Sequence, residues 1–371
     1  MIKRRFVEMD FARAIPLLFL PIVHVFEEFS WWNALSEEAL KSGNVLLYLC
    51  AFGPSIFMMI LGMNIAFTTH NSPKELAARG VKTLVIAVGL NIARFFLPAL
   101  VLYLRGEDWA LMDGIVSCCV SDILPFAGMA FLFFALMRKW KVSPLNIILI
   151  ALALLSVHTL IMPEDMESTW YTELLGNFVH CTEDSSFPVL AWLIYPAIGY
   201  SAGLYMQSRE SEAELMSFYK KTLLASAVGL ASLVIAMQAQ GLDALLIAAA
   251  PANDNMTELF NVMLDVLLGG VFVTLFGFLY FGLQKVASEK VKTFITDLSK
   301  AIMIFFIIHW IIIGWMEYMI ATGYEDTYAL GSGFVWISSV IVMLVSVVLS
   351  IPIRKALSRR KSTKSWIKTV N

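Results

Sequence analysis

The sequence predicts an all-α polytopic membrane protein with about ten transmembrane helices and both termini in the cytoplasm. Composition is the first observation: 59% of the 371 residues are hydrophobic, only 15% are charged, and the mean hydropathy is +0.75. Soluble domains have about 25% charged residues. The second observation is that apolar runs of about 20 residues, the length that crosses a bilayer, recur along the whole chain. The net charge of −2 and the lack of a basic stripe give no reason to expect a nucleic-acid partner.

Ten apolar runs mark the expected spans. They cover residues 11–29, 45–69, 81–104, 114–137, 144–162, 188–207, 222–240, 259–284, 300–321 and 333–353. The apolar tail of the seventh, "GLDALLIAAAP", is interpreted as an interfacial segment because the polar "QAQGLD" interrupts the run. We therefore expect one transmembrane domain over residues 1–353, followed by a basic cytoplasmic tail over residues 354–371.

The basic residues predict the orientation. Of the 27 Lys and Arg residues, all but four fall in the two termini and in the connections on the same side as the termini. The exceptions are Lys41 and Arg105, in connections on the opposite side, and Arg13 and Arg94, inside spans. Because cytoplasmic loops carry the excess of Lys and Arg, that side is the cytoplasmic one. The chain is thus expected to be a multi-pass integral protein, surrounded by lipid, of a bacterial cytoplasmic membrane.

The connection Pro163–Phe187 faces the outer side in this topology. It has six acidic residues, no Lys or Arg, and the aromatic pair Trp170 and Tyr171. Two interpretations stay open. Carboxylates and indole rings together suit the hydroxyls and C–H faces of a sugar, whereas a solvated loop with aromatic residues at the membrane interface has the same composition. The four cysteines show no metal-ligand spacing, so we expect no metal.

Ionisable residues lie on one stripe of the first span. In "FARAIPLLFLPIVHVFEE", His24 returns to within about 20° of Arg13, and Asp10 and Glu28 each lie about 40° from His24. His24 lies about 16 Å above Arg13 along the helix axis. Charged groups inside a span face protein or water and by default indicate a functional path.

Other spans carry ionisable residues as well. They are Arg94, Asp122, His158, Asp265, His309 and Glu317. For some of these a purely structural role is an equal alternative. Arg94 with Asp122 could form a buried ion pair without chemistry, and a single buried histidine such as His158 is typically a hydrogen-bonding link between helices.

The stripe and four further segments carry a resemblance to a known family. An Asp three residues before an Arg, with a His eleven residues beyond that Arg, opens the first span, as Asp10, Arg13 and His24 do. This pattern resembles the transmembrane acyltransferase superfamily, which includes the acyltransferase-3 O-acyltransferases and the heparan-α-glucosaminide N-acetyltransferase type. The further similar segments are "AFGPSIFMMILGMNIAF", "DILPFAGMAFLFFALMRK", "FPVLAWLIYPAIGYSAGLYM" and "FFIIHWIII".

The resemblance implies transfer of an acyl group, acetyl above all, from cytoplasmic acyl-CoA to an acceptor on the outer side. The acceptor would be a hydroxyl or amine of an envelope carbohydrate or a similar small molecule. Arg13 and His24 would take the roles of the family's arginine and histidine, and Asp10 would orient Arg13. Ala14 stands where the family often has glycine, and the loop after the first span lacks the histidine of the N-acetyltransferase branch, which favours a hydroxyl acceptor.

A neutral imidazole can take the proton of an attacking hydroxyl at neutral pH, so His24 is the expected general base. Glu27, Glu28 or Asp265 would orient it, and His309 is the next candidate for the same role. Direct transfer from donor to acceptor is the simplest mechanism, and a transient acyl-imidazole on His24 is the alternative.

Cations would hold the donor. Arg13 and Arg94 are expected to draw the pantetheine arm of CoA and to polarise the thioester carbonyl. The CoA phosphates are expected to meet one of two sets of cytoplasmic cations, either Arg138, Lys139 and Lys141 or else Arg79 and Lys82.

A secondary transporter or flippase for a polar or glycan substrate is the rival interpretation. It too would need buried ionisable residues, and Asp265 near Gly269 and Gly270 could mark a broken helix. The sequence shows no two halves with corresponding Gly/Pro-interrupted spans, which speaks against this class. Stabilisation of the purified protein by acetyl-CoA would separate the two.

Overall fold

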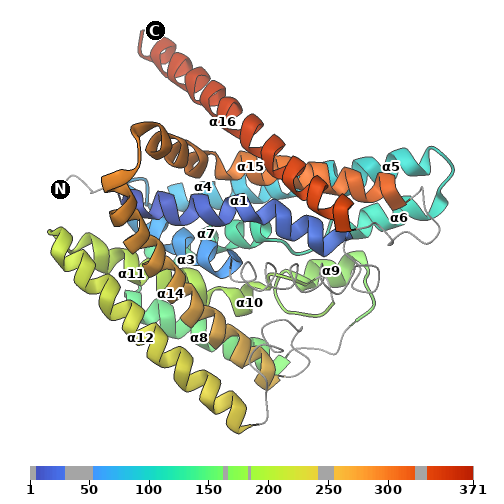
Figure 1. The fold of residues 1–371 in the computed structure, drawn as a ribbon. Helices are drawn as coiled ribbons and strands as arrows, with labels where there is room; N and C mark the ends of the chain where they lie inside the picture. Colours follow the sequence, from blue (N-terminus) through green and yellow to red (C-terminus); the bar gives the residue numbers. More distant parts are fainter. Residues whose placement is uncertain are drawn as a thin grey trace. The chain divides into compact units, whose positions relative to one another are not determined.

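The computed structural model describes residues 6–29, 53–161, 166–182, 185–240, 255–321 and 332–370, and every regular element in them is a helix (Figure 1). The all-α prediction is confirmed. In chain order the elements are α1 (Val7–Phe29), α3 (Gly53–Phe67), α4 (Pro73–Asn91), η1 (Ile92–Phe96), α5 (Leu97–Tyr103), α6 (Asp108–Ser117), α7 (Ile123–Lys139), α8 (Pro144–Ile161), α9 (Trp170–Gly176), α10 (Val189–Trp192), α11 (Ile194–Gln207), α12 (Glu212–Ala239), α14 (Asn255–Val286), α15 (Glu289–Ala321) and α16 (Ser332–Val370).

Eight described helical stretches are long and apolar enough to cross a membrane, which supports a multi-pass membrane protein. The helices α3 and α7, with 15 and 17 residues, are shorter than these. The count of ten spans and the cytoplasmic placement of both termini remain predictions. Residues 45–52 of the expected second span and the expected interfacial segment after residue 240 lie outside the described residues.

The expected span 114–137 begins later than predicted. Its helix, α7, starts at Ile123 because the Asp122 carboxylate accepts a hydrogen bond from the Ile123 backbone N–H and caps the helix. The residues before it form the separate helix α6, which packs against α5 where Gly114 meets Ala99. Apolar composition alone could not separate α6 from α7, since both are rich in hydrophobic residues.

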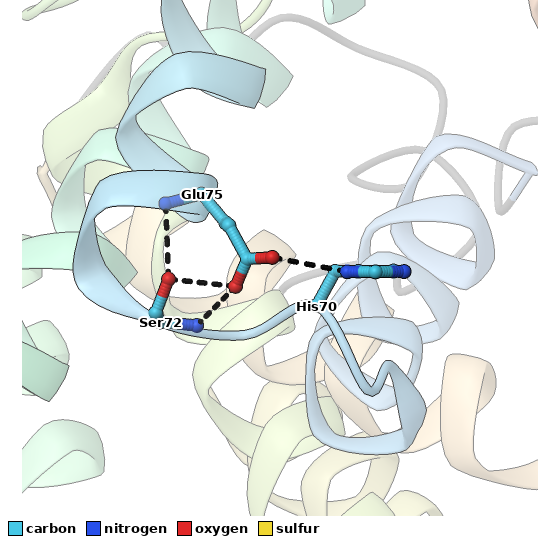
Figure 2. A network of polar contacts seen from close by, with 3 residues as sticks. All are labelled: His70, Ser72 and Glu75. Carbon is cyan, nitrogen blue, oxygen red and sulfur yellow. Dashed lines mark hydrogen bonds and ion pairs between the residues drawn. The ribbon is translucent and has the colours of Figure 1, made fainter. Parts of the chain in front are cut away.

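The helix α4 begins at a capping box (Figure 2). Ser72 Oγ accepts from the Glu75 backbone N–H at 3.3 Å, and the Glu75 carboxylate accepts from the Ser72 backbone N–H at 3.1 Å. The other carboxylate oxygen lies 3.0 Å from His70 Nδ1. These bonds satisfy backbone donors that a helix start leaves open, so the first turn of α4 is fixed by its own sequence.

The chain divides into two compact units, the first of which is residues 1–6 with 51–278. Inside it, helices meet at glycines. A Cβ added at Gly62 would overlap the Pro196 carbonyl, and one added at Gly199 would overlap the Met59 carbonyl, so α3 and α11 touch backbone to backbone. The helices α4 and α7 approach in the same way at Gly80. Close approach of small residues is how membrane helices gain packing energy.

The second unit is residues 7–50 with 279–371, and its described part is α1, α15, α16 and the end of α14. The helices α1 and α15 run parallel, because Asp10 contacts Ser299 at one end and His24 contacts His309 at the other. The helix α16 packs against both α1 and α15. In its contact with α1, the Trp336 ring meets the Phe26 ring in an edge-to-face arrangement. Polar residues of α1 are thus turned toward α15.

Replacing Gly199 with alanine should lower the melting temperature in detergent. The added methyl group would push α11 from α3, and such overpacking costs about 1–3 kcal/mol. Gly89→Ala is the matched control, since nothing lies within 4 Å of a Cβ at Gly89. Equal melting temperatures for both variants would show that the α3–α11 contact is looser than described.

Candidate functional site

The first half of the stripe on α1 is a hydrogen-bonded group. An Arg13 guanidinium nitrogen lies 2.5 Å from Asp10 Oδ1, and the Arg13 Nε–H donates to the Met9 carbonyl at 3.3 Å. Ser299 Oγ donates to the same Asp10 oxygen at 2.9 Å, so α15 holds the carboxylate in place. The Asp10 side chain is 6% exposed and that of Arg13 is 21% exposed. Asp10 thus contacts both Arg13 and Ser299, and the Arg13 side chain stays partly exposed.

The second half of the stripe is an aromatic cluster around His24. The His24 and His309 rings stack with centroids 5.6 Å apart and an interplanar angle of 19°. The Trp310 ring lies 4.3 Å from the His24 ring, so two consecutive residues of α15 contact the same imidazole. His24 is half-buried and His309 is fully buried. The two histidines that the sequence singled out in different spans thus come together.

The ring of His309 is held in one orientation. Its Nδ1 lies 3.1 Å from the Phe305 carbonyl oxygen one turn earlier on α15. A carbonyl only accepts, so Nδ1 is the donor in this hydrogen bond. Phe305 and Phe306 also pack against the ring. This fixes the face that His309 presents to His24.

The acids expected to orient His24 lie in different places. Glu28 follows His24 by one turn on α1 and is half-buried, while the side chain of Glu27 lies outside the described residues. Asp265 belongs to the first unit, where its carboxylate accepts from the Tyr195 hydroxyl at 3.1 Å.

Arg94 forms a buried ion pair in the first unit. It lies in the π-helix η1, is 2% exposed, and has a guanidinium nitrogen 2.9 Å from the Asp122 carboxylate. Its Nε–H donates to the Asn91 side chain at 3.2 Å, and its guanidinium lies 4.3 Å from the Phe95 ring centre. Asn91 donates in turn to the Cys118 carbonyl. The network joins η1 to the start of α7.

Three of the predicted donor-binding cations lie at one end of the antiparallel pair α4–α7. Arg79 is in the second turn of α4, and Arg138 and Lys139 end α7. The guanidinium of Arg79 lies 5.5 Å from the centre of the Phe131 ring. The guanidinium of Arg138 lies 5.7 Å from the centre of the Tyr200 ring. Lys139 is exposed. Aromatic rings preorganise the two arginines, because a cation over a ring face is attracted by its quadrupole.

The described part of the connection between α8 and α10 holds buried polar groups and the thiol of Cys181, and its Asn177 contacts Cys119 in the turn before α7. Burial raises the pKa of the Cys119 thiol, and the charge of Glu173 adds to this; burial likewise raises the pKa of Cys181. Thiols with raised pKa values are poor nucleophiles.

Among the described residues, no group of three or more His, Cys, Asp or Glu side chains is placed to hold a metal ion.

Residues 6–355 match the sequence model of the acyltransferase-3 family, which is described as an acyltransferase domain. The chain belongs to this family. No curated protein and no solved structure was found to match it. The resemblance carried by Asp10, Arg13 and His24 is thereby confirmed at the level of the family, and the transferase interpretation is favoured over the transporter. The protein is a membrane acyltransferase.

Sequence reasoning about this acyltransferase missed three contacts. Ser299 bonds Asp10, Trp310 packs on His24, and Tyr195 bonds Asp265. Ser299 could have been found as a polar residue just before an apolar span, and Trp310 as the neighbour of His309. Tyr195 gave no signal, since tyrosine is common near membrane interfaces.

Asp122→Asn should destabilise the acyltransferase strongly. The amide keeps an oxygen that can cap α7 but leaves the buried Arg94 cation without its counter-charge, and breaking such a pair costs about 3–5 kcal/mol. Melting temperature in detergent measures the loss. Asp108→Asn, at an exposed position on α6, should change little. A wild-type melting temperature for Asp122→Asn would mean that the pair adds no net stability.

Proposed function

We propose that this acyltransferase moves an acyl group, acetyl foremost, from cytoplasmic acyl-CoA to an acceptor on the outer side of the membrane. The acceptor is a hydroxyl, or else an amine, of an envelope carbohydrate or a similar molecule. The observation that carries the proposal is the contact between His24 and His309 within the unit that also holds the Asp10–Arg13 pair. An imidazole can serve as a base at neutral pH, and an arginine can hold an anionic donor.

His24 is the general base in this mechanism. The acceptor oxygen attacks the thioester carbonyl while its proton passes to the His24 imidazole. The C–S bond then breaks, CoA leaves as its thiolate, and the imidazolium returns the proton to the sulfur. No covalent intermediate is needed, and a transient acyl group on His24 is the alternative route.

His309 and Trp310 position His24. The bond from His309 to the Phe305 carbonyl fixes the orientation of its ring, and the stacked His24 ring follows that orientation. Trp310, which follows His309 on α15, covers the His24 ring and so restricts the access of water to the base. Glu28, one turn beyond His24, is the acid proposed to orient the imidazole, and Asp265 is the alternative.

Arg13 acts on a different part of the donor. About 16 Å of helix separates it from His24, so the two side chains cannot act on the same atom. Arg13 therefore binds the pantetheine or phosphate end of acyl-CoA while the acyl end reaches His24. Asp10 and Ser299 hold the guanidinium for that task.

The remaining donor contacts are proposed in the first unit. Arg79, Arg138 and Lys139 form the positive end of the α4–α7 pair and suit the CoA phosphates. A role for Arg94 at the thioester would require its guanidinium to exchange Asp122 for the donor.

His24→Ala should abolish acyl transfer and leave stability close to that of wild type. Release of CoA by proteoliposomes, supplied with acetyl-CoA and a mixed pool of envelope glycans, measures the transfer. His70→Ala, which removes an exposed histidine, is the matched control and should retain full turnover. Full turnover of His24→Ala would end its assignment as the base. A large drop in melting temperature would instead indicate a structural role.

Arg13→Lys should weaken use of the donor although the charge is kept. The planar guanidinium makes parallel bonds that an ammonium group cannot reproduce, so the apparent KM for acetyl-CoA should rise by more than kcat falls. The KM for the acceptor should stay constant. Unchanged donor kinetics would show that Arg13 only pairs with Asp10.

A further inference from the structure

The short helix α9 (Trp170–Gly176) is amphipathic, but it buries its polar side and exposes its apolar side, the reverse of a surface helix on a water-soluble protein. Its polar residues Thr172 and Glu173 are 1% and 0% exposed, and Asn177 directly after it is 9% exposed. Its large apolar residues, by contrast, face outward and are each between 46% and 55% exposed. They are Trp170, Tyr171, Leu174, Leu175 and, after the helix end, Phe178.

The polar side of α9 is anchored by specific bonds. The Glu173 carboxylate accepts from Ser168 Oγ at 2.7 Å and from Thr182 Oγ1 at 3.2 Å. The Asn177 amide donates to the Cys119 carbonyl at 3.2 Å, which ties α9 to the turn before α7. These contacts come from three different segments of the first unit, so the orientation of α9 is fixed and the apolar face is held outward.

The outward face requires an apolar environment. At about 100° per residue the five apolar side chains cover about 140° of the helix, and the buried residues fill the other side. In water an amphipathic helix turns its apolar face to the core. A fixed helix with five large apolar side chains outward therefore indicates a partner that removes them from water.

We propose that α9 lies in the outer membrane–water interface and that its apolar face inserts among the acyl chains of outer-leaflet phospholipids. The chain is a multi-pass membrane protein, and α9 follows the end of the apolar helix α8 at Ile161 by eight residues of sequence. Val157, Leu160 and Ile161, near that end of α8, are also exposed apolar residues. Trp and Tyr are enriched at this depth of the bilayer.

Two further features favour lipid over a carbohydrate acceptor. The acid of α9, Glu173, is fully buried and accepts hydrogen bonds from Ser168 and Thr182, so this helix does not expose a carboxylate beside Trp170 and Tyr171. The helix α6, which contacts α9, also exposes Trp109 and Met112, and these extend the apolar surface. Interfacial helices of this kind bind through buried apolar area.

A photo-crosslinker placed on α9 tests this assignment. Leu174→p-benzoylphenylalanine is introduced into the full chain, which is reconstituted in vesicles of phosphatidylethanolamine and phosphatidylglycerol with alkyne-tagged acyl chains. After irradiation, lipid adducts are measured by mass and by reaction of the tag. The same substitution at Leu160 is the lipid-facing reference, and at Glu210, an exposed residue between α11 and α12, it is the aqueous reference.

The proposal expects a lipid adduct at Leu174 with a yield comparable to that at Leu160 and far above that at Glu210. An adduct at Leu160 but not at Leu174 would overturn it. Crosslinking of Leu174 to a second copy of the chain, or to an added glycan in place of lipid, would overturn it as well and would identify the true occupant of the face. The result is independent of acyl transfer, so it stands or falls separately from the proposed function.

Discussion

The interior of a bilayer has no water to solvate a polar group, and the arrangement of this acyltransferase follows from that constraint. Two arginines within apolar helices each meet a carboxylate: Arg94 meets Asp122, and Arg13 meets Asp10. Apolar helices cannot use the hydrophobic effect to associate within lipid, so they associate by close packing instead. Gly62 and Gly199 make such packing possible between α3 and α11. Polar pairs and glycine contacts together determine which helices are neighbours.

Much of the fold was predictable from the sequence because the bilayer makes composition informative. Apolar runs of the right length located the helices, and the spacing of Arg13 and His24 on one helix face needed only helical geometry. Helix boundaries were less accessible. The start of α7 depends on the Asp122 cap, and neither the cap nor the break after α6 changes the hydropathy of the run.

The candidate site was predictable in its parts and unpredictable in its assembly. His24 and His309 were both visible as intramembrane histidines, but their stacking depends on α1 and α15 running side by side in register. One sequence without relatives carries no signal for that register. The same holds for Asp265, whose contact with Tyr195 joins residues 70 positions apart. For residues 163–187, composition left open whether the acids and aromatics act together or only form a solvated loop, and α9 buries Glu173 while it exposes Trp170.

The π-helix η1 affects where the sequence can lose a residue without disturbing the packing of the helices. Leu76, Gly80 and Thr83 mark the buried stripe of α4, and at about 100° per residue an uninterrupted α-helix would turn Ala99 and Leu102 away from it. The wider π turn absorbs one residue, which brings both back onto the stripe, where they are buried. Losing a single codon within residues 92–96 would thus leave both flanking faces where they are, whereas the same loss in the middle of α7 would rotate half of that helix out of its contacts.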